Sequence, residues 1–186
     1  AISDPSDIVI GGRDDTGIDG IAMFANGIHI ESVETLNYLA SRARIDIDFV
    51  FIQSKSSHKI SAQEIGNFGE GVFSFFQSTG MRESPEIREL KAIKDAIFQK
   101  SAKFTSRPKA FLYFCTASNF TSDKNVDARA DSVSDRIEGL QLFDSVDFIF
   151  LNSDRLTTRY DKISLQLEQE ITFDRHEVFP QIPGIR

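Results

Sequence analysis

Three polar residues at the ends of apolar segments have the types and spacing of a hydrolytic metal site. Asp19 lies between two glycines at the start of an apolar segment, and Gln53 and Lys55 end the apolar run that begins at Phe49. Residues two apart in a strand project from the same face. A carboxylate, an amide and an ammonium can therefore converge at neighbouring strand ends, where they can hold a hard cation and position a water.

The ligand preferences of magnesium suit these groups. Mg²⁺ takes oxygen ligands and keeps several waters, so one or two carboxylates with a backbone carbonyl suffice beside a substrate phosphate. Asp19 offers its carboxylate, Gln53 its amide oxygen and Ser54 its carbonyl, while Lys55 can orient the attacking water and offset phosphate charge. The structural alternative is that Asp19 caps a turn and that Gln53 and Lys55 only end a strand. Spacing alone leaves both interpretations open.

Three residues of the following segment are candidate phosphate contacts. His58 and Lys59 are basic and precede a predicted helix N-terminus, where backbone N–H groups favour anions. Gln63, in the first turn of that helix, is a further candidate. Neither a GxGxxG pattern nor a GK[ST] phosphate loop occurs, which disfavours a nucleotide-binding enzyme.

Composition limits the class of protein. The chain has 186 residues, 40% of them hydrophobic, with 17 Phe, which is enough for one domain with a substantial core. The net charge of −7 argues against a protein that coats nucleic acid, but allows a local basic rim on an enzyme. Cys115 is the only cysteine, so no intrachain disulfide or cysteine zinc site can form, and a reducing cytoplasm is favoured. No apolar run approaches the roughly 20 residues of a membrane span.

Local signals predict alternating strands and helices. Asn26-Gly27 is typical of a type I′ hairpin turn, Ser61 with Glu64 forms a capping box, and Pro85 follows a capping Ser84. Beyond residue 152, helical and alternating spacings both fit. Strands are predicted over 7–10, 18–25, 28–31, 45–54, 109–115 and 146–151, and helices over 32–44, 61–76, from 84 through 97, and 126–143.

This order predicts an α/β fold with a mixed central sheet covered by helices. Gly66, Gly69 and Gly71 weaken the 61–76 helix, and close packing against the sheet is the expected compensation. We expect one domain over 1–178, N-terminally truncated, followed by a linker over 179–186 that leads toward a further region.

Two short motifs resemble a nuclease superfamily. GIDGI at 17–21 and IQSK at 52–55 resemble the PD-(D/E)XK core, most closely Mrr-type restriction endonucleases, whose second motif also carries Gln in place of Glu. DxGIDGI at 15–21, FIQSKS at 51–56 and the following helix resemble the N-terminal region of the abortive-infection phage-resistance (AIPR) family. The resemblance implies a restriction-endonuclease-like fold and a Mg²⁺- or Mn²⁺-dependent endonuclease. It also implies a cytoplasmic role in bacterial phage defence, with DNA as the partner and no membrane. A homodimer is compatible with it.

The same resemblance assigns roles by position. Asp19 matches the metal-binding Asp, Gln53 takes the acidic position and Lys55 matches the catalytic Lys. Because Gln53 is neutral, metal binding is weakened unless Asp15 or Asp14 contributes a carboxylate. The acid that the superfamily often supplies from a preceding helix has no counterpart in this chain. The alternative is therefore a catalytically degenerate module that binds nucleic acid or a protein partner.

Overall fold

The computed structural model describes residues 8–10, 17–57, 59–77, 84–117, 119 and 123–167. Strands alternate with helices along the chain, as the sequence predicts. In chain order the elements are β1 (Gly20–Ala25), β2 (Ile28–His29), α1 (Val33–Arg42), β3 (Ile47–Lys55), α2 (Ala62–Phe76), α3 (Pro85–Gln99), the 3₁₀ turn η2 (Ser101–Lys103), β4 (Lys109–Thr116), α4 (Lys124–Glu138), β5 (Ser145–Leu151) and α5 (Ser153–Leu167).

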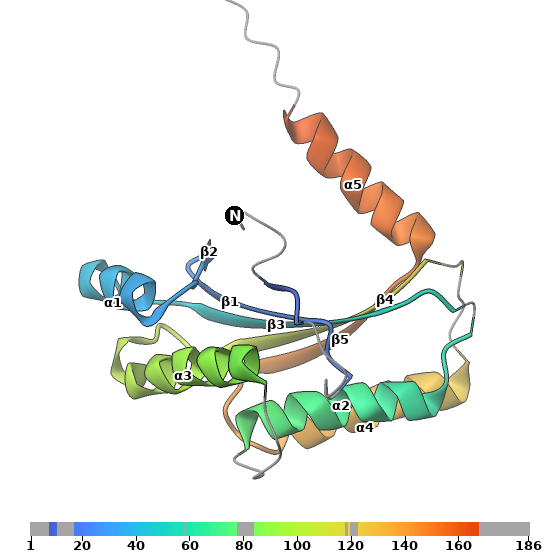
Figure 1. Cartoon of the computed structure of the whole chain (residues 1–186), viewed down its shortest axis with the longest axis horizontal. Coiled ribbons are helices and arrows are strands. Elements are labelled where there is room, and N and C mark those ends of the chain that lie inside the picture. The colour runs from blue at the N-terminus through green and yellow to red at the C-terminus, as the bar shows by residue number, and fades with distance from the viewer. Residues whose placement is uncertain are drawn as a thin grey trace, which may run out of the picture.

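The strands form one mixed five-stranded sheet in the order β2-β1-β3-β4-β5. β1 pairs antiparallel with both β2 and β3, whereas β3, β4 and β5 are parallel. Helices α2 and α3 connect β3 to β4, and α4 connects β4 to β5, as parallel strands require. Figure 1 shows α2, α3 and α4 on one side of this sheet. The predicted α/β class with a mixed central sheet is confirmed.

The two faces of the sheet differ in burial. Phe51 of β3 and Phe114 of β4 are fully buried beneath the helices, where Phe68 of α2 packs edge-on against Phe114. Alternate residues on the opposite face, such as Tyr113 and Cys115, are only half-buried. Because successive strand residues alternate between faces, this pattern marks one covered face and one open face.

Local turn and cap chemistry forms as predicted. Asn26 and Gly27 both have positive φ, 52° and 75°, as a type I′ turn requires. Ser61 accepts from the backbone of Glu64, and the Glu64 side chain returns to the Ser61 N–H. These reciprocal bonds satisfy helix N–H groups that have no intrahelical partner, so the start of α2 is fixed locally.

Several predicted elements change, and β2 ends at His29, before the predicted 31. Helix α4 ends at Glu138, before the predicted 143, because Gln141 adopts a positive φ of 59° that stops the helix. The segment Ser153–Leu167 is helical, which decides the open choice as far as residue 167, and the rest of the alternating pattern, 168–173, lies outside the described residues. Of the predicted strand over 7–10, Val9 forms only an isolated bridge to Gly20 and is 62% exposed. The predicted linker over 179–186 and the boundary at 178 lie outside the described residues.

The glycines of α2 pack against a helix rather than against the predicted sheet. A Cβ at Gly69 would lie 2.4 Å from Cγ2 of Val133 in α4, so a side chain there would overlap. A Cβ at Gly66 would instead meet the guanidinium of Arg129, 2.6 Å from Nη2. The glycines therefore allow α2 and α4 to approach closely, which offsets their low helix propensity.

The two glycines are expected to respond oppositely to alanine. In Gly69→Ala the new methyl meets the stiff, buried Val133 side chain, and we expect the free energy of unfolding to fall by about 1–3 kcal/mol. In the matched control Gly66→Ala, the exposed Arg129 can swing away, and better helix propensity should leave stability unchanged or raise it by up to about 1 kcal/mol. Urea unfolding followed by circular dichroism measures both. A Gly69→Ala variant as stable as the wild type would contradict this packing.

Candidate active site

The pairing of β1 with β3 places Asp19 beside Gln53. Gly20 is paired with Ile52 in this antiparallel ladder, so the preceding and following residues come next to each other. The backbone of Asp19 is held on both sides, because its N–H donates to the Ile52 carbonyl at 2.8 Å and its carbonyl accepts from the Ile10 N–H at 2.9 Å. The position of Asp19 is therefore set by the sheet rather than by a loop.

The Asp19 carboxylate reaches across to the end of β3. Its Oδ2 accepts from Gln53 Nε2 at 2.7 Å, from the Ser54 backbone N–H at 2.5 Å and from Ser54 Oγ at 2.8 Å. No bond to Oδ1 is found among the described residues. The carboxylate therefore joins two strands through one oxygen, which differs from the turn-capping role that spacing alone left open.

Gln53 lies between the two other predicted ligands. Its side chain is only 4% exposed, and Nε2 donates both to Asp19 Oδ2 and to the Ser54 carbonyl, the latter at 3.1 Å. The carboxylate, the amide and the carbonyl therefore meet at one point, as the sequence predicted. Two acceptor oxygens face one partly positive NH₂ group there.

These donors fit a hard divalent cation. Carboxylate, carbonyl and amide oxygens are the ligands that Mg²⁺ prefers, and turning the Gln53 amide by half a rotation would present Oε1 in place of Nε2. That turn gives up the hydrogen bonds of Nε2, so a cation would compete with them. Within the described ranges, no three His, Cys, Asp or Glu side chains form a metal-binding group. With the described residues alone, the site can hold a cation only through its mixed set of oxygens.

Lys55 ends β3 two residues after Gln53, so both side chains project from the same face of the strand. It is half-buried, and no hydrogen bond or ion pair reaches its ammonium from the described part of the chain. Among the described residues, nothing competes with an anion for this ammonium. Asp15, the predicted additional ligand, lies outside the described residues.

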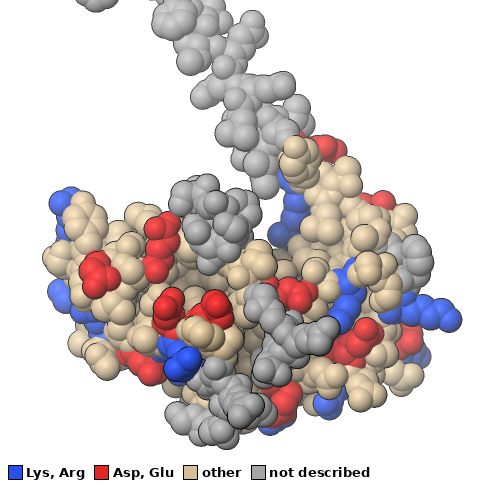
Figure 2. Space-filling view, in the orientation of Figure 1, with Lys and Arg blue, Asp and Glu red and all other residues tan. Residues whose placement is uncertain are grey.

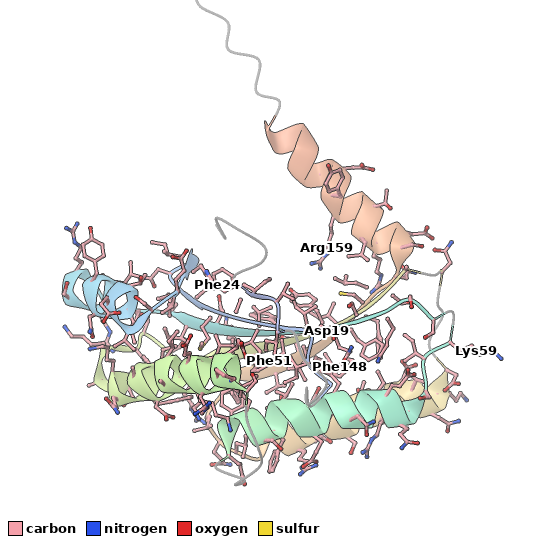
Figure 3. All side chains as sticks on the ribbon, in the orientation of Figure 1. Asp19, Phe24, Phe51, Lys59, Phe148 and Arg159 are labelled. Carbon is pink, nitrogen blue, oxygen red and sulfur yellow. The ribbon has the colours of Figure 1, made fainter. Side chains whose placement is uncertain are left out.

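The predicted phosphate contacts are not gathered here. Figure 3 shows Lys59 at the outer end of the loop after β3, pointing away from Asp19. Gln63 is exposed in the first turn of α2, with no contact to the site among the described residues. His58 lies outside the described residues. Of the six described residues predicted for chemistry or binding, the structure groups Asp19 with the residues at the end of β3 and leaves Lys59 and Gln63 apart.

Sequence reasoning missed a polar group on the open face, opposite the face from which Gln53 and Lys55 project. Parallel pairing puts Cys115 beside Ser54, and the Arg159 guanidinium lies over the Tyr113 ring, 5.8 Å from its centroid. Burial raises the pKa of the Cys115 thiol, while the charge of Arg159 lowers it and that of Asp19 raises it. The thiol is therefore protonated at neutral pH and is a poor nucleophile. No sequence signal could place Arg159 here, because the type of its segment was ambiguous.

Comparison with known proteins finds no significant match. No protein-family model matches the chain, and neither a curated protein nor a solved structure is a significant match. No helix within the described residues combines the length and apolar composition that a membrane span requires. Function must therefore be argued from the site.

Proposed function

We propose that this protein is a Mg²⁺- or Mn²⁺-dependent phosphodiesterase with a restriction-endonuclease-like fold, an endonuclease that acts on DNA in bacterial anti-phage defence. The observation that carries the proposal is the meeting of Asp19 Oδ2, the Gln53 amide and the Ser54 carbonyl at the end of β3. The mixed sheet supports it, and so does the resemblance of GIDGI and IQSK to nuclease motifs.

The arrangement divides the chemical roles among strand residues. A bound divalent cation would polarise the phosphate and lower the pKa of a coordinated water. Asp19, Gln53 and Ser54 would hold that cation through oxygen atoms. Lys55, on the same face as Gln53, would donate to the scissile phosphate and orient the water. The charged groups that act on the phosphate thus lie on rigid strands, which favours accurate positioning.

One observation favours a second candidate function. Gln53 Nε2 satisfies both Asp19 Oδ2 and the Ser54 carbonyl without a cation, so the site is internally complete. We expect such internal hydrogen bonding in a non-catalytic module that keeps the nuclease architecture only to bind nucleic acid or a protein partner. The two functions differ in whether a divalent metal changes the protein.

Plasmid cleavage tests the proposal directly. Supercoiled DNA should be nicked in Mg²⁺ or Mn²⁺ and left intact in EDTA, and Lys55→Ala should lower the rate by about 100-fold or more, since it removes a donor to the developing charge. The matched control is Lys103→Ala, which changes an exposed lysine of η2. Equal rates for wild type and Lys55→Ala, or nicking that persists in EDTA, would refute the assignment.

A further inference from the structure

Helix α5 carries a line of cations away from the sheet. Arg155, Arg159 and Lys162 are spaced by four and three residues, so they share one face of the helix. All three side chains are exposed. Figure 2 shows basic atoms where α5 leaves the body, beside the hollow above the sheet. We refer to these three residues as the α5 basic stripe.

Two contacts direct this stripe toward the sheet. The Arg155 guanidinium donates to the Phe150 carbonyl at 3.0 Å, which ties the first turn of α5 to the end of β5. One turn later, the Arg159 guanidinium lies over Tyr113 of β4. Figure 3 shows the Arg159 side chain directed from α5 into the space above the sheet on the side of Asp19. The stripe therefore faces the open face of the sheet.

Arg159 and Asp19 both lie near Cys115. Cys115 is paired with Ser54, whose N–H and Oγ both donate to Asp19, and the thiol feels the charges of both Asp19 and Arg159. No hydrogen bond or ion pair to the Arg159 guanidinium is found in the described ranges. The Arg159 guanidinium thus stands near the carboxylate that the proposed function assigns to the cation, and none of the described residues occupies its donors.

We propose that the α5 basic stripe binds the phosphodiester backbone of the nucleic acid, with Arg159 contacting a phosphate next to the one that faces Asp19. This inference rests on the proposed function for the class of its ligand. Arginine suits phosphate because its planar group donates two parallel hydrogen bonds. Arg159 is then a positioning residue, which sets where the nucleic-acid strand lies relative to Asp19.

The local charge of α5 suits a polyanion better than the net charge of the whole chain does. The whole protein carries a net charge of −7, which repels a polyanion at most of its surface. Over residues 153–162, three cations face two carboxylates, Asp154 and Asp161, a local balance of +1. Among the described residues, Arg155 and Arg159 of this stripe lie toward the carboxyl ends of β5 and β4, whereas Lys109, which also projects from the open face, lies at the start of β4. Binding should therefore depend on few contacts and be sensitive to salt.

Binding to a fluorescein-labelled DNA duplex in EDTA, followed by anisotropy over a salt series, tests the proposal. Arg159→Gln should weaken binding several-fold and reduce the slope of log K against log salt by about 0.9, the loss of one phosphate contact. Arg159→Lys should keep the wild-type slope because it keeps the charge. The matched control is Arg42→Gln, which removes an exposed arginine lying over Tyr38, at 4.4 Å, on the distant helix α1.

Two outcomes would overturn the inference. The first is an Arg159→Gln slope equal to that of wild type and Arg42→Gln, and the second is a wild type that does not bind the duplex. Because the assay contains no divalent metal, it separates this inference from the proposed function. A protein that binds through Arg159 but never cleaves would refute only the nuclease assignment. A protein that cleaves with no change in slope for Arg159→Gln would refute only the role of the stripe.

Discussion

Asp19→Asn is expected to lower Mg²⁺-dependent DNA cleavage by about a thousandfold, which corresponds to about 4 kcal/mol of lost transition-state stabilisation. Asparagine keeps an oxygen that can accept from Gln53 and Ser54, so the link between β1 and β3 is largely preserved. It removes the one carboxylate among the three proposed cation ligands. Cleavage rates at saturating Mg²⁺ or Mn²⁺, with unfolding curves for both proteins, measure the effect.

The matched control for this variant is Asp131→Asn, which removes the same charge from an exposed position in the middle of α4. Its cleavage rate should equal that of the wild type. A wild-type rate in Asp19→Asn would contradict the assignment of Asp19 as a cation ligand. A rate reduced equally in both variants would show that net charge, rather than the site, is responsible.

Gln53→Glu is expected to make stability depend strongly on divalent metal. Without metal, glutamate loses the Nε2 donor and brings a second carboxylate to the 2.7 Å contact with Asp19 Oδ2. Like charges this close, together with the loss of both Nε2 hydrogen bonds, should lower the free energy of unfolding by about 1–3 kcal/mol. Excess Mn²⁺ should restore it, because two carboxylates and the Ser54 carbonyl then bind the cation more tightly than the amide set does.

Thermal unfolding with and without Mn²⁺ measures this response. The increase in Tm on adding Mn²⁺ should be larger in Gln53→Glu than in wild type. The control Gln63→Glu introduces the same charge at an exposed position of α2 and should show no such increase. A metal-independent Tm in Gln53→Glu would indicate that Asp19 and residue 53 do not share a cation, and would favour the non-catalytic module.

The parts of the fold that were predicted correctly depend on local chemistry. Asn26-Gly27 requires positive φ at both residues, Ser61 and Glu64 satisfy each other's N–H groups, and Pro85 follows a capping Ser84. Each signal acts within a few residues, so no tertiary information is needed to interpret it. The grouping of Asp19 with Gln53 also followed, since each lies at the end of an apolar run that was predicted as a strand.

The missed features depend on contacts between distant segments. Gly69 allows α2 to pack closely against Val133 of α4. In the sequence alone, the same glycine is equally compatible with close packing of α2 against the sheet. After Asn152, helical spacing over 156–163 runs into alternating spacing over 163–173, and the structure forms helix α5 over Ser153–Leu167. The position of Arg159 over Tyr113 therefore had no signal in the sequence.

The central claim is that Asp19, Gln53 and Ser54 share one cation, and an anomalous difference map of crystals grown with Mn²⁺ tests it most directly. We expect one Mn²⁺ peak bound by the Asp19 carboxylate and the Ser54 carbonyl, with the Gln53 amide turned so that Oε1 faces the ion. A map with no peak there, in which Gln53 Nε2 still donates to Asp19 Oδ2, would contradict the account.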